Sequence, residues 1–490
     1  MTAVSPSSLP SLPRPAVILL AVLLAVKLAL LAALGPALFP DSALYLDLGR
    51  AVLDDPGWWR NGGWGSSFAP PALLRPWGYP LLIAATRRLA GDGFGTLLCV
   101  AQCLASTAVL AMLGRLARHL VGDGRRVTAL LMLASLSGFV LFDGALLTDS
   151  LYTDLFLAVM LTLASRTLCG PAPGPVLGLI LGVAWAASLS LRDVGLYHTV
   201  LPLAALALAS RRHRLGAGRM AGLGACFLIP IACYVGLVMG WNDLRTGHPF
   251  FSITGGVNWL WPSVNIADRG LAQPFDCSDP VCRAARRHGV AKGMEGVNGL
   301  AEALWQDDGL DPVALGKVTL AHALGVARTH PVAFVASVLG NMQPAHLGDL
   351  AFNPLANLNE LTRLHSALGA RLVPALREAV QGIRHGAWGL LPVLILEILL
   401  AGAALAGLVL FVVGVPLAAW RRGLSGAGGT VLFLWATAIL FIASYSLVHL
   451  EMRHAMPVIP LVLLATLWAA RQARGGKGAK SPAQDGRIVL

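Results

Sequence analysis

Charge is scarce in this chain of 490 residues: only 13% of the residues are Asp, Glu, Lys or Arg, whereas 56% are hydrophobic. The mean hydropathy is +0.68. A soluble chain of this length could not carry such a composition without exposing large apolar patches. The composition therefore excludes a soluble globular enzyme and predicts an all-α, polytopic membrane protein.

Acidic residues are the scarcer of the charged types, with 25 Asp and Glu against 37 Lys and Arg, a formal net charge of +12. A basic excess can indicate nucleic-acid binding, but short cytoplasmic loops of membrane proteins also accumulate Lys and Arg. Dense basic clusters here follow apolar runs, at 115–126, 211–219, 421–422 and 471–480. Membrane insertion accounts for most of the excess, and we expect no nucleic-acid partner.

No A-x-A cleavage site precedes Asp41, and the apolar run before it, 16–38, is longer than the core of a signal peptide. We therefore expect this run to remain as a membrane anchor. The preceding residues, 1–15, are rich in Ser and Pro and are expected to be disordered and cytoplasmic. The chain also lacks an internal repeat.

Apolar runs long enough to span a membrane recur along the chain. We expect about ten spans, at 16–38, 94–113, 127–142, 150–164, 176–191, 196–209, 220–239, 388–420, 431–448 and 456–470. The segment 79–89 is too short and too charged at its end for a span, and we expect it to lie at the membrane interface. With that choice every dense basic cluster falls on the cytoplasmic side, as the positive-inside rule requires.

The spans imply a simple organisation. The expected parts are a disordered cytoplasmic N-terminus (1–15), a transmembrane core (16–240) whose first outer loop (39–93) carries the chemistry, an extracytoplasmic loop or cap (241–384), C-terminal transmembrane helices (385–470) and a basic cytoplasmic tail (471–490). Within the cap, 312–330 and 331–340 read as helices.

Cysteine is also rare, with seven residues, of which one close pair, Cys277 and Cys282, lies in the long outer segment. Four intervening residues without a second Cys pair are weak support for a zinc site. Because the segment is expected on the oxidising side of the membrane, we predict a disulfide between them. The remaining cysteines are interpreted as small buried hydrophobes: Cys99, Cys103, Cys169, Cys226 and Cys233.

The first outer loop has the least ordinary composition. Asp41 follows the first span directly, and Leu44, Leu48 and Val52 have the spacing of an amphipathic helix. Tryptophans of the kind found at headgroup depth follow, at positions 58, 59, 64 and 77. An acidic residue at a span exit, followed by an aromatic and basic loop, indicates chemistry at the membrane surface.

Four short motifs then occur in order. They are Pro40-Asp41-Ser42 with Tyr45, Arg75-Pro76-Trp77-Gly78-Tyr79-Pro80, Leu146-Leu147-Thr148-Asp149, and Arg453-His454-Ala455-Met456-Pro457. Together they resemble the GT-C superfamily of integral-membrane glycosyltransferases, in the branch (family 39-like) that includes protein O-mannosyltransferases and lipid A aminoarabinose transferase. The resemblance covers roughly the first 200 residues and the last 50.

That resemblance implies transfer of a sugar from a polyprenyl-phosphate carrier to a glycan, lipid or protein acceptor, at the outer face of a bacterial-type inner membrane. The implied site consists of catalytic Asp41 and Asp149, donor-phosphate ligands Arg75, Arg192 and Arg453, and substrate-binding Tyr45, Tyr79 and Asp47. The chain departs from the family in having Arg75 where Lys is common, and Ser42 where a second carboxylate is common.

The residue types suit this chemistry on their own terms. Transfer from a lipid phosphate needs a carboxylate to activate an acceptor hydroxyl, and cations to hold a leaving phosphate whose charge grows in the transition state. The sequence leaves open a divalent metal, Mg or Mn, which Asp41 and Asp149 would hold.

Structural roles for these residues are alternatives. Asp41 and Asp149 could be helix N-caps. Arg192 could pair with its neighbour Asp193, and Arg453 with Glu451. Lys27, in the middle of the first span, needs a partner inside the bundle, for which Glu397 is a candidate from depth alone.

Two other functions are compatible with a polytopic chain. A transporter or flippase of lipid-linked sugars would place ionisable residues near the membrane midplane and contain an inverted repeat. A non-enzymatic partner in envelope assembly is a third possibility. The acidic residues gathered at outer span ends favour transfer.

Overall fold

The computed structural model describes residues 10–55, 57–58, 75–140, 142–168, 171–342, 344–364, 376–424, 426–448 and 450–474. Over these residues the chain is helical, and the β pairing there is an isolated parallel bridge between Ala37 and Ala145. The predicted all-α polytopic class is confirmed. Most of the expected N-terminal disordered segment, Trp59 and Trp64 of the aromatic loop, and most of the basic tail lie outside the described residues.

Within the described residues, seven helical stretches are long and apolar enough to cross a membrane. They are Arg14–Leu34 (α1), Gly78–Val121 (which contains α4 and α5), Thr148–Leu168 (α7), Ala217–Thr246 (α11), Trp388–Arg422 (which contains α21 and α22), Ala427–Ser446 (α23) and Arg453–Arg474 (which contains α25). The pair Pro312–Thr329 (α16) and Pro331–Phe352 is bent by 110° and makes an eighth only if it is one broken span.

Three of the expected spans are shorter than a bilayer requires. The run 127–142 forms α6 (Gly124–Ser135, 12 residues), 176–191 forms α8 (Pro175–Leu191, 17 residues), and 196–209 forms α9 (Gly195–His198) followed by α10 (Val200–Arg212, 13 residues). A helix rises about 1.5 Å per residue, so a 30 Å core needs about 20 residues. By length, the described chain offers seven or eight spans instead of about ten, although α6, α8 and α10 pack against α5, α7 and α11 in the bundle.

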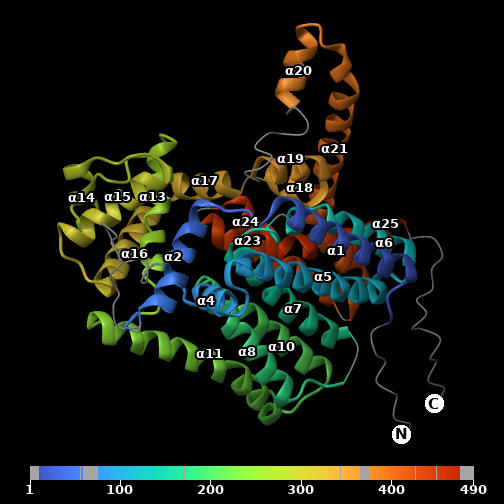
Figure 1. Cartoon of the computed structure of the whole chain (residues 1–490), viewed down its shortest axis with the longest axis horizontal. Helices are drawn as coiled ribbons and strands as arrows, with labels where there is room; N and C mark the ends of the chain where they lie inside the picture. Colours follow the sequence, from blue (N-terminus) through green and yellow to red (C-terminus); the bar gives the residue numbers. More distant parts are fainter. Residues whose placement is uncertain are drawn as a thin grey trace.

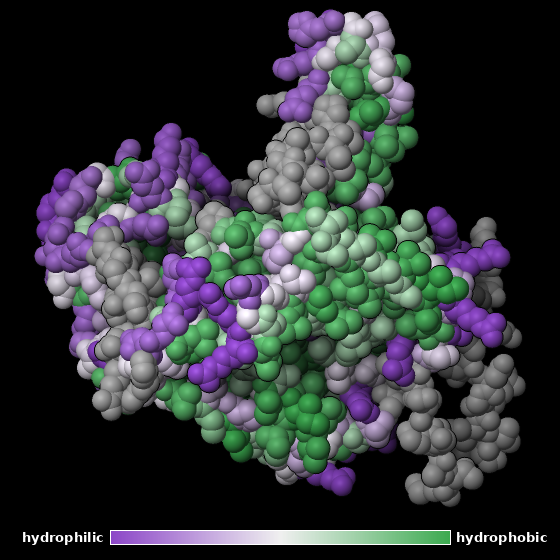
Figure 2. Space-filling model, viewed as in Figure 1, coloured by the Kyte–Doolittle hydropathy of each residue, from purple (hydrophilic) through white to green (hydrophobic). Residues whose placement is uncertain are grey.

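The centre of the bundle is formed by α5 (Phe94–Val121), α7 and α25 (Ile459–Arg474), whose side chains are largely buried. Helices α1 and α11 lie at its periphery and expose apolar residues along their length. Figure 2 shows hydrophobic residues over the bundle and hydrophilic ones over the lobe around α14. This distribution is that of a protein whose bundle faces lipid.

A charge inside α1 is satisfied within the bundle. Lys27 Nζ lies 2.6 Å from Asp143 Oδ2 and 2.9 Å from Ser106 Oγ. Asp143 also accepts hydrogen bonds from Ser106 and Ser150, at 2.6 and 2.7 Å. The suggested pairing of Lys27 with Glu397 is therefore wrong, because the loop before α7 brings a nearer carboxylate to α1.

The first outer loop forms the two expected short helices, α2 (Pro40–Asp54) and α4 (Gly78–Ala90). Helix α4 returns along α5, since Tyr79 Oη donates to Gln102 Oε1 over 3.1 Å. Trp58 and Trp77 stack with ring centroids 4.7 Å apart, and Trp241 of α11 joins them. The aromatic group expected at headgroup depth is thus partly assembled from a residue outside the loop.

The segment after α11 builds a separate lobe, seen at the left of Figure 1. Its helices are α12 (Thr254–Asn258), α13 (Trp261–Asp268), α14 (Pro280–His288), α15 (Gly293–Gln306) and α16. They enclose their own apolar core, which includes Val264, Val281, Leu300 and Leu315. We call α12–α16 the cap lobe.

Beyond the cap lobe the chain returns to the bundle. It forms α17 (Pro331–Met342), α18 (Pro344–Phe352), α19 (Pro354–Leu364) and α20 (Leu376–Arg384) before α21 (Leu391–Val409) and α22 (Val415–Arg422). The expected helices at 312–330 and 331–340 correspond to α16 and α17. Helices α20 and α21 project from the body of the molecule in Figure 1.

Candidate active site

Two arginines from opposite ends of the chain hold the carboxylate of Asp41. Arg75 Nη2 donates to Oδ1 over 2.9 Å, and Arg453 Nη1 donates to Oδ2 over 2.7 Å. All three side chains are partly buried, with exposed fractions of 23%, 30% and 21% for Asp41, Arg75 and Arg453. Each oxygen of Asp41 therefore has its own guanidinium partner.

Asp41 is not the N-cap of α2. The N-cap is Phe39, and Asp41 is the second residue of the helix. The capping role is taken by Ser42, whose Oγ accepts from the Phe39 N–H over 2.9 Å and donates to the Leu146 carbonyl. The capping alternative for Asp41 is therefore wrong, although its charge still suits the helix N-terminus.

Arg453 bridges two carboxylates. It lies in the short α24 (Met452–Ala455), and its Nε donates to Glu451 Oε2 over 2.6 Å while Nη1 binds Asp41. The expected alternative, a pair between Arg453 and Glu451, is thus present together with the pair to Asp41. The planar fork of arginine makes both contacts at once, which an ammonium could not reproduce.

A second ion pair joins Asp149, in the first turn of α7, to Arg192, which follows the last residue of α8. Arg192 Nη2 lies 2.9 Å from Asp149 Oδ1, and the two side chains are 15% and 2% exposed. Asp149 Oδ1 has no well-directed hydrogen bond, so this contact is mainly one of charge. Arg192 does not take the expected alternative, Asp193, which accepts a hydrogen bond from Ser252.

These two groups form one electrostatic unit, which we call the arginine–carboxylate cluster: Asp41, Arg75, Asp149, Arg192, Glu451 and Arg453. Burial alone would raise the pKa of Asp41, but Arg75 and Arg453, with a smaller effect from Arg192, hold that pKa below its usual value. Burial would lower the pKa of Arg192, but Asp149 together with Tyr445, Tyr45 and Tyr152 outweighs this effect, so the pKa of Arg192 is raised.

The three expected substrate-binding residues are placed differently. Tyr45 packs against the cluster, with the Arg75 guanidinium carbon 5.9 Å from its ring centroid. Its hydroxyl lies 3.5 Å from Thr148 Oγ1. Tyr79 is fully buried and meets Tyr45 edge to face at 5.3 Å, so it supports Tyr45 from behind. Asp47 is not brought to the cluster: it is 70% exposed and pairs with Arg50.

Backbone pairing fixes the two acidic segments against each other. The Ala37 N–H donates to the Gly144 carbonyl over 2.8 Å, and the Leu146 N–H donates to the Ala37 carbonyl over 3.0 Å. The connector that leads into α2 is thereby held beside the loop that leads into α7. This is how Asp41 and Asp149, from two different span ends, come to the same region.

The carboxylates as placed do not fit a divalent metal. Both oxygens of Asp41 are bound by arginine, and Asp149 faces Arg192. A Mg or Mn ion needs several free oxygen ligands, and it would be repelled by three guanidinium groups nearby. We therefore derive no step through a metal.

Glu451 and Thr148 are the members of this region that sequence reasoning missed as site residues. Thr148 stands directly before Asp149 in the third motif, and Glu451 stands two residues before Arg453. Their proximity to motif residues was the only available signal. Long-range packing places these two residues in the site, and a local sequence pattern cannot show such packing.

No protein-family model and no curated protein matches the chain. Among solved structures, ArnT from Cupriavidus metallidurans in the apo state is similar, with 15% identity and a TM-score of 0.35, over 93% of this chain and 77% of that one. The archaeal oligosaccharyltransferase AglB from Archaeoglobus fulgidus, in complex with an inhibitory peptide and a dolichol-phosphate, has 11% identity and a TM-score of 0.40. That match covers 96% of this chain and 53% of AglB, so this chain spans about half of AglB. Both TM-scores lie below 0.5, so neither likeness assigns a function to this chain.

Proposed function

We propose that this protein is a family 39-like glycosyltransferase that moves a sugar from a polyprenyl phosphate to a hydroxyl group of an envelope glycan, lipid or protein. The observation that carries the proposal is the carboxylate of Asp41, held by Arg75 and Arg453 in the first turn of the helix that follows α1. This arrangement combines the base and the anion-binding groups that such a transfer requires.

The arginines retain donors for a phosphate. A guanidinium has five N–H donors, and Arg75 uses one of them on Asp41. Within the described part of the chain, the Nε–H of Arg75 is buried without a hydrogen-bond partner. Buried donors are almost always paired in native proteins, so this one favours a ligand with acceptor oxygens. A phosphate oxygen supplies such an acceptor, and arginine binds it with two parallel hydrogen bonds.

The charges of the cluster suggest an order of events. Three arginines face three carboxylates, so the cluster is close to neutral, and a phosphate that binds both Arg75 and Arg453 competes with their existing partners. Asp41 is the carboxylate that contacts both of these arginines. Donor phosphate takes up these guanidinium groups and releases the Asp41 carboxylate, whose pKa then rises because its cations are shared with another anion.

The released carboxylate is the base that accepts the proton of the acceptor hydroxyl as that oxygen attacks the sugar. The bond between the sugar and the phosphate breaks, and the charge that grows on the leaving phosphate is stabilised by Arg75, Arg453 and Arg192. Asp149 keeps Arg192 charged and oriented. Tyr45 closes one side of the cluster.

A donor with a polyprenyl tail must remain in the lipid, so the site has to lie at headgroup depth. Asp41 follows the apolar α1 after six residues, and Trp58, Trp77 and Trp241 cluster against the apolar face of α2. We place this surface at the outer face of a bacterial-type inner membrane, because the basic loops then lie in the cytoplasm.

Transport of a lipid-linked sugar is the alternative, and one experiment separates the two. Purified protein is reconstituted in liposomes with radiolabelled polyprenyl-phosphate sugar and candidate acceptors. Label on an acceptor supports transfer. Label that crosses the bilayer with the lipid intact supports a flippase and overturns the proposed reaction. Lys27, the ionisable residue in the middle of the first span, is paired with Asp143.

A further inference from the structure

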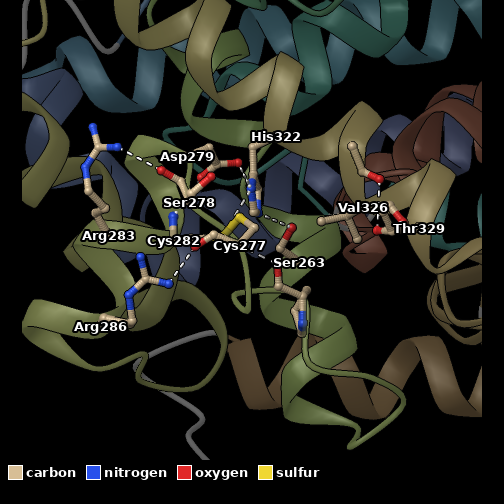
Figure 3. The surroundings of a disulfide bond; sticks show 12 residues. Ser263, Cys277, Ser278, Asp279, Cys282, Arg283, Arg286, His322, Val326 and Thr329 are labelled. Carbon is tan, nitrogen blue, oxygen red and sulfur yellow. Dashed lines mark hydrogen bonds and ion pairs between the residues drawn. A yellow bond between two sulfur atoms is a disulfide. The ribbon is translucent and has the colours of Figure 1, made fainter.

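The disulfide of the cap lobe lies in an unusual environment. The loop before α14 holds Cys277 and Asp279, the first turn of α14 holds Cys282, and α16 brings His322 against them (Figure 3). One ligand atom from each of these four residues lies within 4.8 Å of the others. Asp279 lies between the two cysteines in the sequence, and the packing of α16 on α14 adds the nitrogen donor of His322.

We propose that these four residues form a zinc-type metal site when the cysteine pair is reduced, and that the metal and the disulfide are alternative states of the same residues. The site lies in the cap lobe and does not depend on the proposed transfer reaction. The donor set is two thiolates, one imidazole and one carboxylate, and these are the ligands that tetrahedral zinc takes in proteins. The four residues between the cysteines also fall within the usual spacing of a zinc ligand pair.

The distances are compatible with a tetrahedral ion. His322 Nδ1 lies 4.0 Å from Cys282 Sγ and 2.7 Å from Asp279 Oδ2. With metal bonds of about 2.0 to 2.3 Å, neighbouring ligand atoms stand about 3.3 to 3.8 Å apart. The imidazole and the carboxylate therefore need to separate by less than about 1 Å, while the two sulfur atoms part once their bond is broken.

The ligands are oriented by a surrounding set of contacts. Ser263 Oγ lies 2.9 Å from His322 Nε2, which leaves Nδ1 facing the loop. Asp279 accepts the Cys282 N–H at Oδ1 over 2.8 Å, so Oδ2 is turned toward His322. The Phe275 ring stacks on the imidazole. Such outer contacts, which fix a histidine's ring and a carboxylate's direction, accompany most metal sites.

Charge around the loop also suits a thiolate site. Arg283 donates to the Ser278 carbonyl over 2.8 Å, and Arg286 donates to the Cys277 carbonyl over 2.6 Å. Two thiolates and one carboxylate give a zinc complex one net negative charge. Two guanidinium groups held at the adjacent carbonyls stabilise that charge.

Ser263, His322 and Asp279 are linked in the order of the catalytic triad of hydrolytic enzymes. A hydrolytic function is excluded because the serine is not accessible to a substrate. Ser263 is completely buried, at 0% exposure, within the cap lobe. A nucleophile must reach its substrate, and Ser263 cannot. Its hydroxyl orients His322 instead.

The redox step balances with a dithiol as reductant. The dithiol gives two electrons and two protons to the Cys277–Cys282 bond and becomes a disulfide itself. The two thiols then lose their protons as the metal binds, so metal uptake releases two protons. A sulfur atom that is bound to the metal cannot at the same time form the disulfide, so bound metal protects the cysteine pair from oxidation.

The first test is titration of the full-length protein in detergent. The protein is reduced with a trialkylphosphine, the reductant is removed by desalting under inert gas, and Co²⁺ alone is added. We expect one equivalent to bind with a Kd on the order of 1 μM or tighter, with the visible absorption of tetrahedral cobalt and a thiolate charge-transfer band, both removed by Zn²⁺. The unreduced protein should give neither band. No charge-transfer band in folded, reduced protein up to millimolar Co²⁺ overturns the proposal, and so do equal bands without reduction.

Matched variants separate a ligand role from loss of folding. Cys277→Ser changes an exposed residue of the site and should weaken binding by more than about 100-fold, whereas Cys233→Ser changes an exposed free cysteine of α11 and should not alter it. Asp279→Asn keeps an N-cap for α14 but removes the anionic ligand, and a loss of about 10- to 100-fold is expected. Equal affinity of the Cys277→Ser and Cys233→Ser proteins contradicts the site.

A labelling experiment gives an independent readout. Cys277, the exposed member of the pair, should resist a thiol reagent before reduction, react after it, and be protected again when Zn²⁺ is added to the reduced protein. Cys233, near the middle of α11, should give the same extent of labelling in all three states. Reduced cysteines that Zn²⁺ fails to protect rule out the metal-bound state.

Discussion

Asp41 and Arg453 are 412 positions apart in the chain, and their side chains are joined by an ion pair of 2.7 Å. The pair connects the helix after the first span to the start of the last one. Arg75 holds the other oxygen of the same carboxylate. The cluster therefore joins the N-terminal and C-terminal parts of the membrane domain.

Removal of the charge of Asp41 should abolish transfer. We expect Asp41→Asn to lower kcat by about 100-fold or more, because the amide cannot accept the proton of the acceptor hydroxyl. Initial rates with radiolabelled polyprenyl-phosphate sugar measure this. Asp47→Asn, an exposed carboxylate on the same helix, is the control and should keep its rate. A folded Asp41→Asn protein with wild-type rate would falsify the catalytic assignment.

Lysine in place of the cluster arginines should weaken donor binding. Arg75→Lys and Arg453→Lys keep the charge but lose the planar fork, so we expect the donor KM to rise by about 10-fold or more. Arg192→Lys should lower kcat more than it raises KM, because Arg192 acts on the leaving phosphate while paired with Asp149. The control is Arg50→Lys, which changes an exposed arginine. Unchanged kinetics in all three variants would contradict the phosphate site.

The pH dependence should differ between free and donor-bound enzyme. In the free protein the arginines hold the pKa of Asp41 below 3.8, so Asp41 should cause no acid limb in kcat/KM above about pH 4. The ion pairs stabilise the fold above the unfolded-state pKa of Asp41, and this contribution is lost as the pH falls toward the lower folded-state pKa.

In the donor complex the arginines also bind phosphate, so the pKa of Asp41 should rise. The acid limb of kcat should therefore lie at a higher pH than that of kcat/KM, which the two rate profiles measure directly. Replacement of Arg453 by Gln should move the kcat/KM limb upward as well. Coincident acid limbs for kcat and kcat/KM would argue against release of Asp41 by the donor.

Topology is open to a direct test with alkaline phosphatase, which is active only outside the cytoplasm. If α4 lies at the interface, a fusion after Gly124 should be inactive and one after Arg269 active. The reverse pair of results would make α4 a crossing element and would place Asp149 on the other side of the membrane from our expectation.

Replacement of one partner of the buried Lys27–Asp143 pair should destabilise the protein strongly, whereas replacement of both partners should destabilise it little. Asp143 is 3% exposed, so Lys27→Met leaves a buried charge without its cation, and we expect a loss of about 3 to 5 kcal/mol in stability. Addition of Asp143→Asn should recover most of it. Thermal unfolding in detergent compares the three proteins. A single variant as stable as the wild type would mean that Ser106 and Ser150 suffice for Asp143.

The outline of the fold and most members of the arginine–carboxylate cluster could be predicted because they depend on local patterns. The apolar run of α1, the spacing of Leu44, Leu48 and Val52 in α2, and the helices of the cap lobe are all periodic signals. The role of Arg453 was suggested by a motif, but its contact with Asp41 depends on the packing of the whole bundle.

The predictions that the structure corrects were also made from local patterns, which do not report how helices pack together. Helices α6 and α10, of 12 and 13 residues, are shorter than a span: α6 ends at Ser135, before the turn at Gly138–Val140, and α10 ends at Arg212. Lys27 was matched to Glu397 by depth, although partners inside a bundle are selected by side-to-side packing, which brings Asp143. The third and fourth donors of the proposed metal site come from α14 and α16, and no spacing rule connects His322 to Cys277.

The β bridge between Ala37 and Ala145 couples the position of the site to that of α1, and therefore to bilayer thickness. Helix α1 has 21 residues, about 31 Å of length, which is close to the thickness of the hydrocarbon core. A thinner or thicker bilayer tilts or shifts such a helix. Because Ala37 is hydrogen-bonded to Gly144 and Leu146, any such displacement is shared by the segments that carry Asp41 and Asp149. The two carboxylates therefore keep a common depth relative to each other, and lipid composition acts on the height of the whole site above the membrane.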